Sequence, residues 1–361
     1  MDMLQSLLLR PTNSIREAMV AINANTKGIV LVVDEARKLI GTVTDGDIRR
    51  AILNNASIND SIKEVLSGKH GERYPQPVFA PAGTAQSKLL ALMQKHSIEQ
   101  IPLLDSAGCV VDLVTLSELV PDQSLGLNAV VMAGGFGKRL RPLTENTPKP
   151  MLPVGDRPLL EHIVEQLRDS GIKNISMSLH FEAEQIADHF QDGAAHGVNM
   201  SYLREDSPLG TAGGLCLLDR PQQPILVMNG DILTKVDFRA LLAYHREHQG
   251  AVTVSVRKYD LAVPFGVVEC ADKDVVAIRE KPTVELFVNA GIYLLEPYVL
   301  DFIPHGQPFD MPDLINKVAE AKLSVCAFPI WEQWLDIGEP TDYFKARQSV
   351  VSADGVAPSE S

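Results

Sequence analysis

The sequence contains no long apolar segment. None of its apolar runs approaches the roughly 20 residues that a helix needs to cross a bilayer, which excludes a membrane-spanning helix. The N-terminal stretch has no basic leader, and no small-residue cleavage site follows its short apolar run. We therefore expect a cytoplasmic protein with no membrane partner.

Cysteine and positive charge are also scarce. The cysteines Cys109, Cys216, Cys270 and Cys326 show no paired spacing, so neither a disulfide framework nor a zinc site is expected. Lys and Arg number 33 against 46 Asp and Glu, a net charge of −13. A general nucleic-acid binder needs a cationic face. We therefore expect no nucleic-acid partner, and any phosphate chemistry must occupy a local pocket.

The 361 residues are enough for two or three domains. Residues 120–127 are rich in turn formers and separate two regions of different pattern. We expect an N-terminal domain over residues 1–120, a linker over 121–127 and a second domain over 128–350. Glycine, proline and serine crowd residues 351–361, which predicts a disordered tail.

The N-terminal part contains a weak internal repeat. The short apolar strands 28–34 and 99–105 both end in Asp, and the offset between them also aligns residues 39–44 with residues 110–115. Each unit is expected to fold as helix, strand, strand, helix. Two such half-sheets bury their apolar faces best against each other, which predicts one compact domain.

This repeat resembles a tandem pair of CBS domains, α+β modules of the cystathionine β-synthase type. Residues 41–48 are similar to the ribose-binding turn of that family, which implies that Thr44 and Asp47 contact an adenine nucleotide. A carboxylate can accept hydrogen bonds from two ribose hydroxyls. The second unit departs from this pattern, with Thr115 and Glu118 at the matching positions. Alternatively, Asp47 only caps a helix starting at Ile48, and the pair is a packing or dimerisation module.

In the second part, strands and helices alternate, as in α/β folds with mostly parallel sheets. Residues 128–133 (NAVVMA) and 224–228 (PILVM) are almost entirely apolar, as expected for strands covered on both faces. The remaining pattern predicts helices over 158–170, 183–190 and 238–247, and strands over 175–179, 200–203 and 251–256.

A glycine-rich, basic loop follows the first of these buried strands. Residues 134–144 read GGFGKRLRPLT and residues 147–154 read TPKPMLPV. Glycines let backbone N–H groups approach an anion closely, and a basic island in an acidic chain concentrates polyphosphate. Two familiar phosphate motifs are excluded, because Arg139 stands where a P-loop needs Ser or Thr and Leu140 stands where a Rossmann fingerprint needs Gly or Ala.

The two stretches closely resemble the signature of sugar-phosphate nucleotidyltransferases, which join a nucleoside triphosphate (NTP) to a sugar 1-phosphate. The resemblance implies a Rossmann-like domain with a mixed, mostly parallel sheet. It also implies that Arg139 binds the pyrophosphate leaving group and that Lys149 binds the α-phosphate. The residues that it implies around the nucleotide phosphates are Ala133, Gly134, Gly135, Gly137, Lys138 and Arg139.

Two acidic residues at strand ends are candidate metal ligands. Asp231 follows the buried strand 224–228, and Asp336 lies in the sequence Trp-Leu-Asp-Ile-Gly. Open α/β sheets bind ligands at their carboxyl edge, and Mg²⁺ prefers a few carboxylates together with phosphate oxygens. By resemblance, Asp231 and Asp336 jointly hold Mg²⁺, and Asp231 is also catalytic. Taken singly, either residue could instead cap the next helix.

The loop REDSPLGTAGG at 204–214 ends a strand and opens a helix. In the family this loop holds the nucleobase, which implies contacts from Glu205, Gly210, Thr211 and Gly213. Gly210 and Gly213 allow close backbone approach to a flat ring. Guanine offers two adjacent donors to a carboxylate, so Glu205 favours GTP. Some uridylyl enzymes also carry a glutamate nearby, which leaves UTP as the alternative.

The sugar phosphate is expected to contact a later set of family segments. Lys281 would bind its phosphate as a point charge and would also be catalytic, and Glu280 would accept hydrogen bonds from sugar hydroxyls. Gly266 and Asn289 stand in the matching segments 265–269 and 289–291. Glu280 and Lys281 taken alone could equally be a solvated ion pair.

In the inferred reaction, the sugar 1-phosphate oxygen attacks the α-phosphorus of the NTP and pyrophosphate leaves. The nucleophile is already an anion, so catalysis consists of alignment and charge neutralisation. A CBS pair before a guanylyl-type domain resembles enzymes that supply GDP-activated amino sugars, such as glucosamine-1-phosphate guanylyltransferases of legionaminic acid biosynthesis. The alternatives are a mannose-1-phosphate guanylyltransferase, a uridylyltransferase and a catalytically weak nucleotide-sugar sensor. We also expect a homodimer or higher homo-oligomer, mediated by the CBS pair.

Overall fold

The structure, a computed structural model, describes residues 4–69, 76–96, 98–120 and 125–353, which fall into two compact units, Met1–Gln123 and Ser124–Ser361. Among these residues no helix is both long and apolar enough to pass through a bilayer. Residues 121–124 of the expected linker and 354–361 of the expected tail lie outside the described residues. The first three residues expected in the tail instead continue a helix that ends at Ala353.

The first unit contains two three-stranded sheets with the orders β1-β2-β3 and β4-β5-β6. In each sheet the first two strands are parallel and the last two are antiparallel. The elements are η1 (Gln5–Leu7), β1 (Leu8–Leu9), α1 (Ile15–Asn25), β2 (Ile29–Val33), β3 (Leu39–Thr44), α2 (Asp45–Leu53), α3 (Ile62–Gly68), β4 (Ala80–Pro81), α4 (Gln86–His96), β5 (Gln100–Leu104), β6 (Val110–Thr115) and α5 (Leu116–Leu119).

The repeat extends to details of the backbone. The register of the β2–β3 pair shifts at Val33, and that of the β5–β6 pair shifts at the matching Leu104. Thr44 and Thr115 each cap the following helix through a reciprocal pair of hydrogen bonds. A short strand precedes the first helix of each half, which the sequence pattern did not predict. One apolar cluster contains Leu31 and Leu113, so the two halves share a core.

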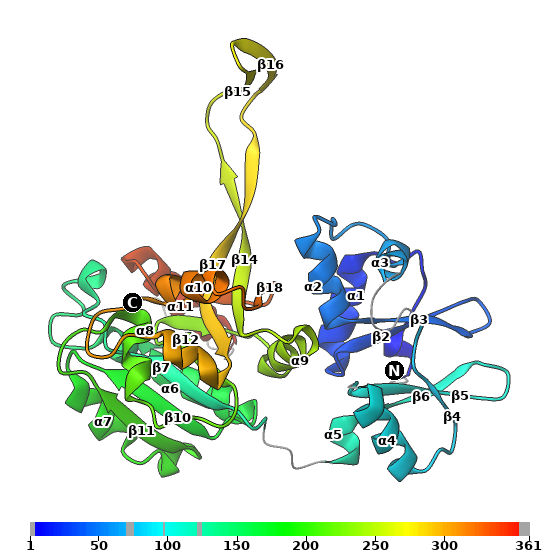
Figure 1. The fold of residues 1–361 in the computed structure, drawn as a ribbon, viewed down its shortest axis with the longest axis horizontal. Coiled ribbons are helices and arrows are strands. Elements are labelled where there is room, and N and C mark those ends of the chain that lie inside the picture. The colour runs from blue at the N-terminus through cyan, green and yellow to red at the C-terminus, as the bar shows by residue number, and fades with distance from the viewer. Residues whose placement is uncertain (1–3, 70–75, 97, 121–124, 354–361) are drawn as a thin grey trace. The chain divides into compact units, whose positions relative to one another are not determined.

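The second unit contains a seven-stranded mixed sheet with the order β11-β10-β7-β12-β17-β14-β18 (Figure 1). All neighbouring strands in it are parallel except β17, which is antiparallel to β12 and to β14. The expected α/β architecture with a mostly parallel sheet is confirmed. The seven strands are β7 (Asn128–Met132), β10 (Asn174–Leu179), β11 (Asn199–Arg204), β12 (Ile225–Asn229), β14 (Val252–Ala262), β17 (Thr283–Leu295) and β18 (Val325–Ile330).

Two apolar cores cover the two faces of this sheet. Because successive side chains of a strand point to opposite faces, Leu226 and Met228 of β12 lie in one core and Val227 lies in the other. The first core also receives α6, α7, α9 and α11, and the second receives α10. The helices are α6 (Leu159–Asp169), α7 (Ala183–Phe190), α8 (Gly210–Gly213), α9 (Phe238–His248), α10 (Met311–Glu320) and α11 (Pro340–Ala353).

Shorter elements complete the second unit. Three two-stranded sheets pair β8 (Pro153–Val154) with β9 (Arg157–Pro158), β13 (Ile232–Thr234) with β19 (Trp334–Asp336), and β15 (Val267–Ala271) with β16 (Asp274–Arg279). The 3-10 turns are η2 (Lys138–Leu140), η3 (Lys149–Met151), η4 (Ala194–His196), η5 (Gly214–Leu217) and η6 (Pro297–Phe302). The β13–β19 pair brings residues about a hundred positions apart next to each other, at the end of β12.

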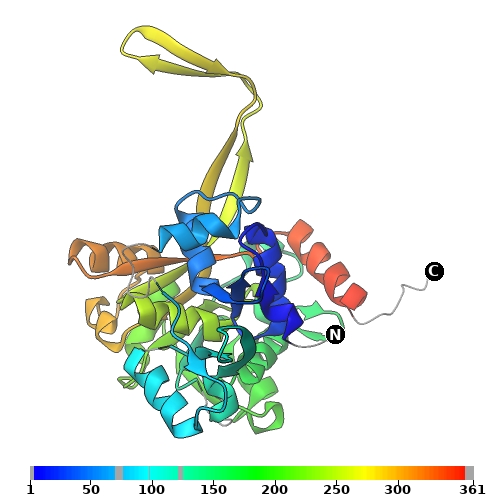
Figure 2. The same cartoon turned by 90° about the vertical axis from the view of Figure 1, so that its right-hand side faces the viewer.

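A long β-hairpin, here called the arm (residues 257–288), projects from this sheet (Figures 1 and 2). The strand expected over 251–256 continues to Ala262 and pairs with β17 as far as Thr283, and β15 and β16 extend the hairpin further. Cross-strand neighbours share a face, so Tyr259 and Leu286 lie on one apolar face, while the Lys258–Glu285 ion pair lies on the other. The sequence pattern predicted the strand over 251–256 but neither its continuation nor the arm.

Candidate active site

The glycine-rich loop leaves β7 at the carboxyl edge of the sheet, and its shape follows from its glycines. A Cβ on Gly134 would lie 3.1 Å from the backbone nitrogen of His180, so glycine lets the loop pass close to the end of β10 without displacing it. Gly137 has a φ of +59°, and its carbonyl accepts a hydrogen bond of 2.8 Å from the Thr144 hydroxyl. Gly135 has open space beside it, where a ligand can approach the backbone.

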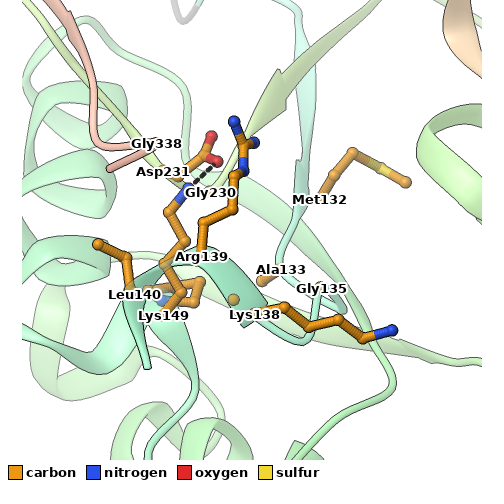
Figure 3. A pocket seen from close by; sticks show the side chains of 12 residues that line it. Met132, Ala133, Gly135, Lys138, Arg139, Leu140, Lys149, Gly230, Asp231 and Gly338 are labelled. Atoms are coloured by element: carbon orange, nitrogen blue, oxygen red, sulfur yellow. Dashed lines mark hydrogen bonds and ion pairs between the residues drawn. The ribbon is translucent and has the colours of Figure 1, made fainter. Parts of the chain in front are cut away.

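This loop forms one wall of a pocket of about 230 Å³ (Figure 3). Arg139 extends to the same side of the pocket as Asp231, and Lys138 extends to the opposite side. The pocket therefore combines three basic side chains with an acidic one. Its lining residues are Met132, Ala133, Gly135, Gly137, Lys138, Arg139, Leu140, Lys149, Pro150, Gly230, Asp231 and Gly338.

Lys149 and Asp231 form the closest ion pair of this pocket. The Lys149 Nζ lies 2.5 Å from Asp231 Oδ2, and the two side chains are 11% and 27% exposed. The other carboxylate oxygen, Oδ1, is buried and has no hydrogen-bond partner among the described residues. A buried oxygen without a partner is costly, which makes this atom a natural place for a cation.

Asp336 lies beside Asp231, as the sequence predicted. It is paired in register with Ile232 across the β13–β19 ladder, and the Ile337 amide donates to the Asp231 carbonyl oxygen at 3.0 Å. Removal of water by the surrounding protein and the charge of Asp231 raise the pKa of Asp336, while the charges of Lys149 and Arg139 oppose this change. The two carboxylates therefore lie close enough to repel each other, and an added cation would lower this repulsion.

The chemistry of these two carboxylates fits Mg²⁺. The ion needs only one or two protein carboxylates, because waters and substrate phosphates complete its octahedron. Asp231 and Asp336 supply hard oxygen ligands, and one of those oxygens is the buried atom without a partner. No group of three or more His, Cys, Asp or Glu side chains suited to a metal occurs among the described residues. A phosphate-dependent magnesium site is the arrangement that these residues support.

In the loop expected to hold the base, Glu205 makes hydrogen bonds within the protein. Glu205 accepts hydrogen bonds from the Ser178 hydroxyl at 2.5 Å and from the Leu209 amide at 2.9 Å. Both of its carboxylate oxygens therefore already have a partner. Its main-chain oxygen also contacts the ring of His180, at 2.9 Å from Nδ1.

The glycines of this loop have a packing reason. A Cβ on Gly210 would lie 2.8 Å from the Phe309 carbonyl oxygen, and the amides of Ala212 and Gly213 both donate to that oxygen. Thr211 donates to the Asp310 carboxylate through its amide and its hydroxyl. The glycines were expected to allow the loop backbone to approach a nucleobase. In the structure they allow it to approach Phe309, in the segment before α10.

The structure does not bring the expected sugar-site residues to the pocket. Gly266, Glu280 and Lys281 lie in the arm, in the connections between the β14–β17 ladder and the β15–β16 ladder. Asn289 lies at the base of the arm, where its side chain bonds to the Tyr293 hydroxyl and to the amide of Gly291. The physical reason is that β14 and β17 continue to pair beyond the sheet and carry the segment between them outward.

In the first unit, Thr44 and Asp47 bond to each other at the start of α2. The Thr44 amide donates to Asp47 Oδ2 at 2.7 Å, and the Asp47 amide donates to the Thr44 hydroxyl at 3.2 Å. The helix begins at Asp45, so its cap is Thr44 and not Asp47. Asp47 is also paired with Arg50 and, at 2.5 Å, with Lys69. A ligand that binds this carboxylate has to compete with these cations.

Several pocket residues were not selected from the sequence. Gly230 and Gly338 line the pocket, and both stand within motifs used for the neighbouring aspartates. The sequence feature that could have identified them is a glycine one or two positions from each acidic residue. Met132 and Leu140 are apolar residues that nothing in the local pattern distinguishes from core.

Comparison with known proteins agrees with this geometry. The family model described as "Nucleotidyl transferase" matches residues 128–353, and the model described as "CBS domain" matches residues 5–54. A UTP–glucose-1-phosphate uridylyltransferase of Synechocystis is 34% identical, with 63% of this chain and 64% of the relative covered. A mannose-1-phosphate guanylyltransferase of Mycobacterium tuberculosis is 34% identical, with 64% and 66% covered.

A solved structure, that of HddC from Yersinia pseudotuberculosis, is 26% identical with a TM-score of 0.50, covering 62% of this chain and 99% of that chain. The chain spans slightly less than two thirds of the length of the two curated relatives. The matched family model covers more than half of the chain, including the whole pocket. The chain therefore belongs to the nucleotidyl transferase family and carries a CBS domain ahead of that region.

Proposed function

We propose that this protein transfers a nucleotidyl group from an NTP to a sugar 1-phosphate, releasing pyrophosphate and a nucleotide sugar. The observation that carries the proposal is one pocket lined by a glycine-rich loop, Arg139, Lys149 and Asp231, with Asp336 close enough to interact with the charges of all three side chains. Cations that bind phosphate and carboxylates that bind a metal are the two components that this chemistry needs.

In the proposed reaction the new bond forms between a sugar-phosphate oxygen and the α-phosphorus, and the bond from the α-phosphorus to the bridging oxygen breaks. Arg139 binds the leaving pyrophosphate, whose charge grows as that bond breaks. Lys149 binds the α-phosphate oxygens and stabilises the charge that develops there. No side chain needs to remove a proton, because the nucleophile is already an anion.

Asp231 and Asp336 are the proposed Mg²⁺ ligands. When bound, the ion would supply neutralising charge to phosphate oxygens. The protein's own contribution is to hold Asp336 at the end of the β13–β19 ladder and Asp231 in the residue before β13, next to Lys149.

GTP is the proposed nucleotide, and two observations support it. One is the carboxylate of Glu205 in the loop after β11; the other is the similarity to a relative named as a guanylyltransferase. Each Glu205 oxygen carries a second lone pair, so the bonds that it accepts from Ser178 and Leu209 leave acceptor capacity for a base. The similarity to a relative named as a uridylyltransferase keeps UTP as the competing nucleotide.

The proposed acceptor is a hexose or hexosamine 1-phosphate. Glucosamine 1-phosphate follows from the resemblance of the domain arrangement, and mannose 1-phosphate follows from the name of the Mycobacterium tuberculosis relative. In this proposal Lys281 binds the phosphate of the acceptor. That role requires the arm to bend toward the pocket when substrates bind.

The proposal is tested by measuring pyrophosphate release for four NTPs against glucosamine, mannose and glucose 1-phosphates. We expect release to need both substrates and Mg²⁺, with GTP giving the highest rate. Lys149→Ala should abolish most of it, and Lys173→Ala should not, because Lys173 is exposed and precedes β10 at the opposite edge of the sheet. Absence of release with every pair, or release without a sugar phosphate, would overturn the proposal.

A further inference from the structure

In the structure, Lys149, which is proposed to bind phosphate, is paired with Asp231, which is proposed to bind the metal ion. The ammonium lies 2.5 Å from Asp231 Oδ2, and the other oxygen of the same carboxylate has no partner among the described residues. A lysine in this position supplies part of the charge that a divalent cation would supply. An ammonium held on Asp231 has less of its charge and fewer of its three donors left for a phosphate.

Asp231 is held by the backbone on both sides. The amide of Gly230 donates to the Met132 carbonyl oxygen at 2.9 Å, and the carbonyl oxygen of Asp231 accepts from Ile337 at 3.0 Å. A Cβ on Gly230 would lie 2.9 Å from that same Met132 oxygen, so this turn is packed against β7. The backbone that carries the carboxylate is thus held in place at the sheet edge.

Lys149 is the partner that can move. Its backbone lies in the short 3-10 turn η3, and its four-carbon side chain carries a point charge with three donors and many rotamers. If a cation takes its place at Asp231, the ammonium swings away and stays inside the same pocket, which the glycine-rich loop lines. Arg139 lies nearby, so the ammonium released from Asp231 is repelled by the Arg139 guanidinium. A bound phosphate would offset this repulsion.

We propose that Lys149 competes with the divalent cation for Asp231 and is released to the phosphate only when that cation binds. The exchange makes the ligand-free protein a weak binder of free metal ions and couples metal binding to nucleotide binding. The phosphate half of this inference rests on the proposed function, and the competition for Asp231 does not. Lys149 thus first occupies the metal site and then, after the cation has bound, binds the phosphate.

The competition is tested with Mn²⁺ alone, by titrating ligand-free protein and detecting free ion by electron paramagnetic resonance. Lys149→Met removes the competing charge, so Mn²⁺ should bind at least about tenfold more tightly, the change that 1.4 kcal/mol produces. The matched control is Lys138→Met. It removes an equal charge from the same pocket, but Lys138 lies over the Phe136 ring, 5.5 Å from its centre, and points away from Asp231.

We expect the control to change the affinity for Mn²⁺ by less than about twofold. Equal tightening by the two substitutions would overturn the inference, because it would show a general effect of charge in the pocket. No tightening by Lys149→Met in protein that melts normally would overturn it as well.

A second measurement uses the unchanged protein, in case Lys149→Met does not fold. Amine acetylation of Lys149, followed by mass spectrometry, should accelerate when Mg²⁺ alone is added, because the cation releases the ammonium from Asp231. The exposed Lys173 serves as the internal reference. An unchanged or slower reaction of Lys149 would overturn the inference.

The two proposals fail separately. Competition between Mn²⁺ and Lys149 without formation of a nucleotide sugar would refute the proposed function and leave this inference in place. Formation of a nucleotide sugar without such competition would refute this inference alone.

Discussion

At the scale of single residues, the fold brings a few charged side chains together from distant parts of the sequence. Lys149 and Asp231 are 82 positions apart, yet their charged atoms are in contact. Asp336 joins them through one rung of the β13–β19 ladder. The charges would repel or attract weakly in water, and the partly buried pocket strengthens their interactions.

The first prediction concerns the role of Lys149 in the chemical step. Lys149→Ala should lower kcat by about 10²- to 10³-fold, as is typical when one charge-stabilising donor at a transition state is removed. Single-turnover measurement of pyrophosphate release checks this value, and the melting temperature checks folding. A rate within threefold of the unchanged protein would refute the assignment.

The second prediction concerns His245, a buried residue outside the pocket. Its ring lies 2.7 Å from the Thr253 hydroxyl and 3.3 Å from Glu296. Burial lowers the pKa of His245 and the charge of Arg246 acts in the same direction, while Glu296 opposes them. The unfolded chain therefore binds the proton more readily, and stability should fall as the pH drops below about 6.5, the ordinary value for histidine.

Thermal melts of the unchanged protein and of His245→Gln between pH 7.5 and 5.5 check this direction. The substituted protein should lose less stability across the window, because glutamine does not titrate. Parallel pH profiles for the two proteins would show that His245 contributes nothing to the dependence.

At the scale of elements, sequence pattern predicted the inner strands and helices well and the arm poorly. Residues 225–228 and 129–132 are apolar throughout, which identifies strands covered on both faces. In the part of the arm formed by β14 and β17, many apolar residues alternate with charged ones. That pattern predicts only that one face of the strands is apolar. It does not say where the hairpin points, because the direction is set at the bulge where β14 and β17 leave the sheet.

The same limit applies to the site. The glycine-rich loop and Asp231 could be placed together from the sequence because strand ends of a parallel sheet meet at one edge. Lys149 and Asp336 were added by family resemblance, since β19 pairs with β13 outside the seven-stranded sheet. The internal hydrogen bonds of Glu205 and Asp47 could not, since a carboxylate that holds its own loop has the same sequence as one that faces a ligand. Long-range contacts such as that of Thr211 with Asp310 leave no local signal at all.

The third prediction tests the base of the arm at Gly291. This glycine has a φ of +69°, and a Cβ there would lie 2.5 Å from Ile232 and 2.7 Å from the Asn229 side chain. Gly291→Ala should therefore cost the strain of the left-handed conformation, about 1–2 kcal/mol, and a further 1–3 kcal/mol, roughly, for overpacking.

Gly306→Ala is the matched control, because Gly306 has the same φ with nothing near its Cβ position. It should cost only the conformational strain. Urea unfolding of both variants gives the difference, and an equal loss of stability would contradict the packing seen at Gly291.

At the scale of the whole molecule, each unit has its own core. Among the described residues, the apolar clusters given for the first unit contain residues before 120, and those given for the second contain residues after 124. All residues that line the pocket come from the second unit. The residues named for the proposed chemistry therefore all belong to that unit.

The fourth prediction follows from this division. A chain of residues 124–361 should fold on its own and release pyrophosphate at a rate within a few-fold of the full chain. Circular dichroism melts and the release assay check it. A folded fragment without activity would show that the first unit contributes directly to the reaction.

The most direct test of the central claim follows the α-phosphorus itself. Incubation of the full chain with GTP labelled at the α-phosphate, Mg²⁺ and a sugar 1-phosphate should place all transferred label in a nucleotide sugar, with unlabelled pyrophosphate formed in equal amount. Lys149→Ala should nearly abolish this transfer. Label found only in GMP or GDP, with no nucleotide sugar from any acceptor, would contradict the account.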